Sequence, residues 1–195
     1  APTLESDKVE YTFKGWSKTI NGETVYTNGA SVKNLTSTKG EIINLYANWE
    51  STNITLKQPT REGYEFVGWS KIRKGETISN TFTTEEDETL YAVWKPITYK
   101  VKYNGNTSTS GSMEDTTHTY DESKTLRTNS YKKEYTVTYD LDYENAPTLE
   151  SDKVEYTFKG WSTTSDGETV YTNNASVKNL TSTKGEIINL YAKWE

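Results

Sequence analysis

The chain of 195 residues contains no cysteine, a single histidine and a single methionine. Without cysteine it can form no disulfide, no thiolate metal site and no cysteine nucleophile. Apolar residues make up only 32% of the sequence, which is too little for one large core. No apolar run approaches the roughly 18 residues of a membrane span, and no apolar leader opens the chain. We therefore expect no membrane insertion.

The formal net charge is −6, so the composition does not favour nucleic acid or an anionic membrane surface as a partner. Aromatic residues, in contrast, make up 13% of the chain and include 15 tyrosines and 6 tryptophans. That content is far too high for a disordered polar tail. The sequence therefore predicts several small modules, each held together by aromatic side chains.

Internal repetition dominates the sequence. Residues 1–50 recur as residues 146–195, and 45 of the 50 positions are identical. The pairs that differ are Lys18/Thr163, Ile20/Ser165, Asn21/Asp166, Gly29/Asn174 and Asn48/Lys193. This degree of identity indicates a recent duplication.

A third, divergent copy lies between the two near-identical ones. Its motif Tyr64–Trp69 matches Tyr11–Trp16 and Tyr156–Trp161, and its motif Leu90–Trp94 matches Leu45–Trp49 and Leu190–Trp194. All six tryptophans belong to these two motifs. Tryptophans placed so regularly indicate a structural role in packing rather than catalysis.

Alternating apolar and polar residues predict β-strands over 42–49, 97–103 and 135–143. Strict alternation would place Trp16 on the opposite face from Tyr11 and Phe13. Either a bulge at Gly15 returns Trp16 to the core side, or Trp16 packs against a neighbouring module. The best helix candidate is Ser31–Leu35, long enough for one or two turns.

The polar breaks after the second motif divide the chain near residues 50 and 96. We expect a first module at 1–50, a divergent module at 51–96 and a full-length module at 97–195. The first module lacks the equivalent of residues 135–145, so we expect it to be truncated at its N-terminus. Its exposed strand edge would then pair with another chain or with the next module.

The two motifs, above all Arg61–Trp69 followed by Thr89–Trp94, resemble the Listeria–Bacteroides repeat, the B-repeat of internalin-type surface proteins in Gram-positive bacteria. The resemblance implies a mainly β fold made of tandem β-grasp, or ubiquitin-like, modules with antiparallel sheets and little helix. It also implies an extracellular location at the bacterial cell surface.

Catalytic and metal sites have few candidates. His118 has Asp115 and Asp121 three residues to either side, with Ser110 and Ser112 nearby, but triad members are recognised by geometry and not by proximity in sequence. We therefore predict no catalytic residue, no enzyme activity and no cofactor.

Acidic residues suggest two further interpretations. Asp140, Asp142 and Glu144 would share one strand face, where they could hold Ca²⁺ or simply be solvated. A solvated face is the more common arrangement, so we predict no metal site. Residues 85–88 are expected to form a charged turn.

Tyr46, Tyr91 and Tyr191 should point away from the Leu/Trp face of their strands. There they either pack on a neighbouring element or stack against a sugar. We therefore expect a non-catalytic stalk or spacer segment used in adhesion, and as the alternative a multivalent binding module for a host glycan or receptor. The expected partners are neighbouring repeats of the same chain, in a monomer or in a dimer swapped through the first module.

Overall fold

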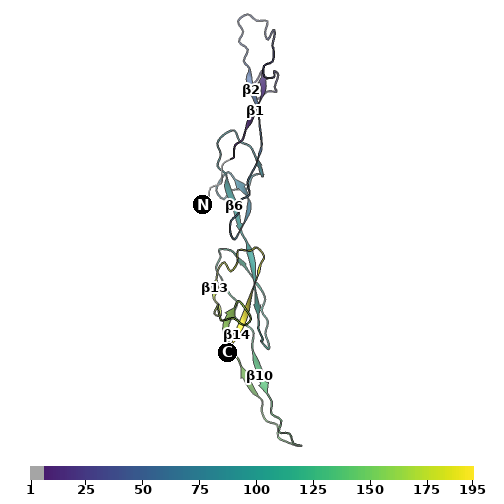
Figure 1. The fold of residues 1–195 in the computed structure, drawn as a ribbon, viewed down its shortest axis with the longest axis vertical. Coiled ribbons are helices and arrows are strands. Elements are labelled where there is room, and N and C mark those ends of the chain that lie inside the picture. The colour runs from purple at the N-terminus through teal and green to yellow at the C-terminus, as the bar shows by residue number, and fades with distance from the viewer. Residues whose placement is uncertain (1–6) are drawn as a thin grey trace. The chain divides into compact units, whose positions relative to one another are not determined.

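A computed structural model describes residues 7–195, and all the regular structure in this range is β-strand (Figure 1). The prediction of a mainly β protein is confirmed. The short helix predicted at Ser31–Leu35 is wrong, because the segment is irregular. Forming a first helical turn is unfavourable, and five residues offer too few bonds to offset that cost. Within residues 7–195 there is no helix that could cross a membrane.

Contacts divide the chain into two compact units. One unit contains the residues up to Gln58 together with Val67–Val93, and the other contains Pro59–Phe66 together with Trp94–Glu195. The strands of the first repeat and the middle repeat are β1 (Tyr11–Ser17), β2 (Tyr46–Ser51), β3 (Ile54–Thr55), β4 (Tyr64–Ser70), β5 (Thr81–Phe82) and β6 (Tyr91–Pro96). They form three two-stranded sheets, β1-β2, β3-β5 and β4-β6.

The C-terminal unit contains the largest sheet of the described residues. Its strands are β7 (Thr98–Asn104), β8 (Thr116–Thr119), β9 (Lys124–Thr125), β10 (Glu134–Val137), β11 (Asp152–Glu155), β12 (Phe158–Ser162), β13 (Ser176–Val177) and β14 (Ile187–Trp194). The four-stranded sheet has the order β12-β14-β7-β8. Two short pairs, β9-β13 and β10-β11, complete the unit.

The central pair of this sheet, β7 and β14, is parallel, whereas its two outer pairs, β12-β14 and β7-β8, are antiparallel. The expectation of wholly antiparallel sheets is therefore wrong at this position. A parallel pair needs a long return connection, and residues 105–186 supply it. The β-grasp arrangement also includes a helix, which residues 7–195 do not contain, so the structure does not show that finer form.

Alternation along β7 is as the sequence predicts. Tyr99, Val101 and Tyr103 are buried, and the lysines between them are exposed. Their side chains pack with the core of the duplicated segment, whose buried members are Trp161, Val177, Leu190 and Ala192, together with Leu126. The core of the C-terminal unit thus combines residues from before and within the duplicated segment.

The bulge predicted at Gly15 is confirmed. The register of β1 on β2 shifts between Phe13 and Gly15, so that Lys14 is the extra residue. The same shift occurs between Phe158 and Gly160. Both bulges bring the tryptophan next to the preceding phenylalanine, on the same side of the sheet.

Residues 135–143 differ from the prediction of a half-buried strand. The strand β10 ends at Val137 and pairs only with β11, outside the four-stranded sheet. The exposed apolar residues of this stretch are Tyr135, Val137, Tyr139, Leu141 and Tyr143. Residues 134–137 thus pair only with Asp152–Glu155 of the duplicated segment, and the strand that joins its core is β7.

Candidate functional site

The two motifs of the C-terminal repeat form an aromatic cluster. The ring of Phe158 lies edge to face with Trp161 at 5.1 Å and with Trp194 at 5.6 Å between centroids. Trp161 is fully buried, and its indole Nε1 has no hydrogen-bond partner among the described residues. The Nε1 of Trp194 donates to the carbonyl of Gly105 at 3.0 Å. These tryptophans serve in packing.

The first repeat forms the same cluster with less cover. Phe13 lies 5.3 Å from Trp16 and 5.3 Å from Trp49, again edge to face. However, Trp16 is 37% exposed and Trp49 is 56% exposed. The local geometry is therefore encoded within the repeat, while the burial depends on a segment outside it.

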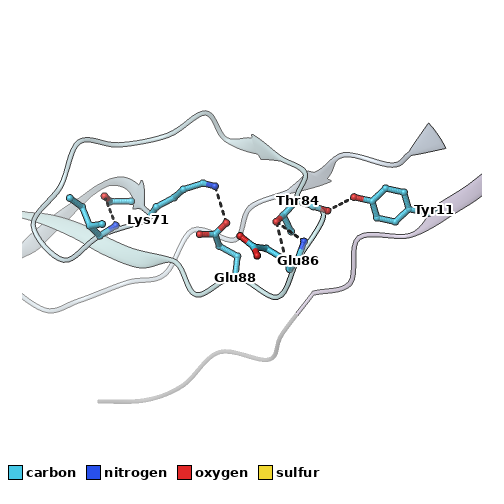
Figure 2. A network of polar contacts seen from close by, with 7 residues as sticks. Tyr11, Lys71, Thr84, Glu86 and Glu88 are labelled. Atoms are coloured by element: carbon cyan, nitrogen blue, oxygen red, sulfur yellow. Dashed lines mark hydrogen bonds and ion pairs between the residues drawn. The ribbon is translucent and has the colours of Figure 1, made fainter. Parts of the chain in front are cut away.

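The middle repeat keeps the aromatic pair, with Phe66 and Trp94 5.4 Å apart. Figure 2 shows the polar contacts at its acidic turn. The hydroxyl of Tyr11 donates to the carbonyl of Thr84, and Lys71 pairs with Glu88 at 2.8 Å. The Oγ1 of Thr84 donates to the carbonyl of Glu86 at 2.9 Å. Of the residues 85–88 expected to form a charged turn, Glu86 and Glu88 thus take part in structural contacts.

Residues 97–131 cover the duplicated segment of the C-terminal unit. Besides the β7-β14 pairing, the Nδ2 of Asn106 donates to the carbonyl of Ala192 at 2.9 Å. The backbone N–H of Leu126 donates to the carbonyl of Ala175 at 2.9 Å. These hydrogen bonds fix the covering segment at several separate points of the repeat.

His118 is a core residue of this covering segment. Its ring stacks on Tyr99 at 5.4 Å, and its Nε2 lies 2.9 Å from the Oγ1 of Thr116. Nδ1 has no hydrogen-bond partner among residues 7–195, although the acid of a triad would bind there. Burial, followed by the charge of Lys124, lowers the pKa of His118 below its usual 6.5.

The other members of the considered triad lie in local structure. The Oγ of Ser130 donates to the carbonyl of Ser112, and Ser110 forms a backbone bridge to Lys132. Asp115 has no contact that joins it to His118 among those described for this segment. Asp121 has a different role, at a joint between residues 59–66 and the C-terminal repeat.

This joint is a polar cluster around Asp121. Its carboxylate accepts hydrogen bonds from the Tyr64 hydroxyl at 2.7 Å and from the Asn179 Nδ2 at 3.0 Å. The ammonium of Lys178 lies at 3.4 Å. Hydrogen bonds from Asn179 and Tyr64 hold the pKa of Asp121 down, at about 2. The same bond to Asp121 raises the pKa of Tyr64.

Two further contacts belong to the joint. Lys184 pairs with Glu65 at 2.6 Å, and the N–H of Ile97 donates to the carbonyl of Gly63 at 3.0 Å. Gly63 has a φ of 72°, and a Cβ there would overlap the ring of Tyr120. Sequence reasoning missed this cluster because its members are 57 and 58 positions apart. The only local signal was Gly63.

The strand face considered for calcium is not formed, because β10 ends before Asp140. The Oδ1 of Asp140 instead accepts the N–H of Asp142 at 2.9 Å in a local turn. No group of three or more acidic or histidine side chains in the described part of the chain is arranged to hold a metal ion.

The three tyrosines on the second strand face differ in their surroundings. Tyr46 is 37% exposed, whereas Tyr91 and Tyr191 are partly buried. The guanidinium of Arg73 lies 4.8 Å from the centre of the Tyr91 ring. Tyr191 lines a hollow of about 340 Å³ together with Tyr171 and Leu180.

The fold and the repeated aromatic clusters define a tandem-repeat β protein. The family model of the Listeria-Bacteroides repeat domain matches the sequence three times, at residues 2–48, 37–93 and 136–193. The chain belongs to this family. The resemblance read from the two motifs is thereby confirmed. No solved structure is significantly similar to the chain.

Two relatives come from Evansella cellulosilytica. One, named as a membrane protein, is 26% identical over 185 residues, which cover 82% of this chain and 25% of the relative. The other, named as a Gly-rich membrane protein, is 31% identical over 145 residues, which cover 70% of this chain and 14% of the relative. The chain thus spans a quarter or less of the length of these relatives.

Proposed function

We propose that the chain is a non-catalytic tandem-repeat segment of a bacterial cell-surface protein, where it acts as a stalk or spacer in adhesion. The observation that carries this proposal is the aromatic cluster, built in both near-identical copies with the same bulge and the same rings. In tandem arrays each unit contacts mainly its neighbours, so reach grows with copy number while local structure stays unchanged.

The comparisons support the surface location and the absence of catalysis. The family consists of repeat domains, and both relatives are named as membrane proteins. Within the described residues, the single histidine is stacked in the core. A surface segment of a Gram-positive adhesin, set in or beyond the cell wall, is consistent with these features.

Surface display with a variable number of units tests the spacer role. The 145-residue period, residues 1–145, is inserted zero, one or two extra times between a membrane anchor and a terminal epitope. We expect the height of the epitope above the membrane, measured by super-resolution localisation, to rise with each unit. A height that does not change with copy number would contradict the proposal.

A second candidate function is multivalent binding of a host glycan or receptor. The hollow beside Tyr191, which Tyr171 and Leu180 also line, favours it, because tyrosine rings stack well on sugars. Linked copies would gain about 10²–10⁴ in apparent affinity where geometry permits. A glycan panel tests it, with Tyr191→Ala as the variant and Tyr135→Ala, a substitution at an exposed site away from the hollow, as the control.

Saturable binding that Tyr191→Ala removes and Tyr135→Ala keeps would favour the binding module. If neither the parent chain nor the control binds a glycan, the binding module is excluded and the spacer function is kept. The two experiments are independent, because the height of an epitope does not depend on a ligand.

A further inference from the structure

We propose that the first repeat is an acceptor for a covering segment of the same kind as residues 97–131, supplied by a neighbouring repeat. The segment would add a strand parallel to residues 42–46 and close the aromatic cluster around Trp16. This inference concerns how repeats assemble with each other and goes beyond the spacer function.

The two near-identical copies show what is missing. In the C-terminal copy, Ile187–Tyr191 pair with Lys100–Asn104 of β7 in parallel. In the first copy, the equivalent residues 42–45 are not in a strand, and β2 begins only at Tyr46. Because the two sequences are identical here, the difference in structure follows from the presence or absence of a partner strand.

Burial of the core side chains changes in the same way. Leu190 and Ala192 are completely buried. Of their counterparts, Leu45 is partly buried and Ala47 is exposed. Trp161 is completely buried, and Trp16 is not. The first copy therefore presents an apolar strip along an open strand edge, and no strand of residues 7–195 pairs with that edge.

The hydrogen-bonding groups that hold the covering segment are also present in the first copy. In the C-terminal copy these groups belong to Asn173, Ala175, Gly185, Glu186 and Ala192. Their counterparts are Asn28, Ala30, Gly40, Glu41 and Ala47, all of identical residue type. The first copy therefore keeps these five hydrogen-bonding residues of the acceptor.

The two copies differ at five positions. At only one of these positions does the C-terminal copy have a side chain with a described hydrogen bond to the covering segment. The Oγ1 of Thr128 donates to the Oδ1 of Asn174 at 2.7 Å, and the first copy has Gly29 at this position. The loss of one exposed hydrogen bond is a small effect beside the pairing of a whole strand. Divergence between the copies has thus left the acceptor intact.

The occupant must satisfy the pattern of β7. It needs alternating apolar residues for the core face, as at Tyr99, Val101 and Tyr103, with polar residues between them. The loop and the short strand that follow must reach the counterpart of β13, where Lys124 and Thr125 pair in the C-terminal copy. Residues 97–131 contain all of these parts, so their sequence is the appropriate probe.

The test adds residues 97–145 directly before Ala1 of the full chain, which reproduces the order found at 97–195. Hydrogen exchange is then followed by mass spectrometry in residues 42–49. The corresponding peptide from 187–194 differs at Asn48/Lys193, so mass distinguishes the two. We expect exchange at 42–45 to slow by about tenfold or more, toward the rate at 187–190.

The control is the same extended chain with Val101→Asp in the added segment alone. Val101 is completely buried, so the charge should prevent pairing and leave residues 42–45 unprotected. The unchanged peptide 187–194 shows in each sample that the C-terminal repeat is folded. Exchange at 42–45 that stays fast in the extended chain would overturn the proposal.

Size-exclusion chromatography identifies the source of the occupant. We expect protection at 42–45 in a monomer, as a neighbouring repeat in the same chain requires. Protection found only in a dimer would mean that a second copy of the chain supplies the covering segment. That result would overturn a source in the same chain.

Discussion

Tyr103 meets Trp161 edge to face, with ring centroids 5.1 Å apart and planes inclined at 61°. Tyr103 comes from β7, and Trp161 lies in the duplicated segment, so this contact joins the covering segment to the repeat. In the first repeat, the ring contacts described for Trp16 involve Phe13 alone. The equivalent tryptophans therefore differ: Trp161 is a core residue of the C-terminal repeat, whereas Trp16 is partly exposed in the first repeat.

This relationship predicts unequal effects of a matched pair of substitutions. Trp161→Ala should destabilise the C-terminal repeat by about 3–5 kcal/mol, because it removes a fully buried indole. Trp16→Ala should cost less than about half as much in the first repeat. Urea denaturation followed by peptide-resolved hydrogen exchange measures both. Equal losses would show that the first copy is already covered.

Gly160 should not tolerate a side chain. It has a φ of 137°, and an added Cβ would lie 2.5 Å from the carbonyl of Tyr171. Gly160→Ala should therefore destabilise the repeat by about 2 kcal/mol or more. Gly185→Ala is the control, because its φ is 74° but no atom lies within 4 Å of the added Cβ. Thermal unfolding should show the smaller loss for the control, of about 1 kcal/mol.

His118 should make stability depend on pH near neutrality. Burial lowers its pKa in the folded state below the usual 6.5, so the unfolded chain binds the proton more readily. The free energy of unfolding should be unaffected by this group above about pH 6.5. It should fall as the pH drops below that value, by less than about 1.4 kcal/mol per pH unit.

The control for this effect is His118→Phe, which keeps a ring to stack on Tyr99 but cannot be protonated. Its unfolding free energy should lack the slope below about pH 6.5 that the parent chain shows. A slope of the same size in both proteins would assign the effect to other groups.

Asp121 should hold the joint between residues 59–66 and the C-terminal repeat. Because its folded pKa is lowered to about 2 from 3.8, its contribution is present above about pH 4 and is lost as the pH falls through 2. Asp121→Asn should speed hydrogen exchange at residues 63–66 at neutral pH, because Tyr64 and Lys178 lose the charge that they contact. Asp115→Asn is a control with no described part in the joint.

The sequence was sufficient for those features that a few adjacent residues determine. Alternation identified β7, and the glycine before each tryptophan indicated the bulge that the structure contains. In contrast, alternation over residues 135–143 also predicted a half-buried strand, and there the side chains are exposed. A pattern of alternation shows that a segment can form a strand, but burial also needs a core against which the strand packs.

Relationships between distant segments were beyond the sequence. The parallel pairing of β7 with β14 joins residues more than 80 positions apart, and no local spacing marks it. The Asp121 joint depends on Tyr64 and Asn179, which lie in separate segments. Residues 1–50 and 146–195 are nearly identical in sequence, and the difference in the burial of their side chains depends on the neighbouring segment.

The direction of the strands determines how each repeat responds to tension along the chain. In the C-terminal repeat, β7 is entered at its first residue and β14 is left at its last, and the two are parallel neighbours. A pull on the two ends slides one strand along the other, so the hydrogen bonds between them carry the load together. In β1 and β2, Tyr11 pairs with Ser51, so the pulled ends are adjacent and the bonds open one after another. A repeat that has received its parallel strand is therefore the stronger mechanical link.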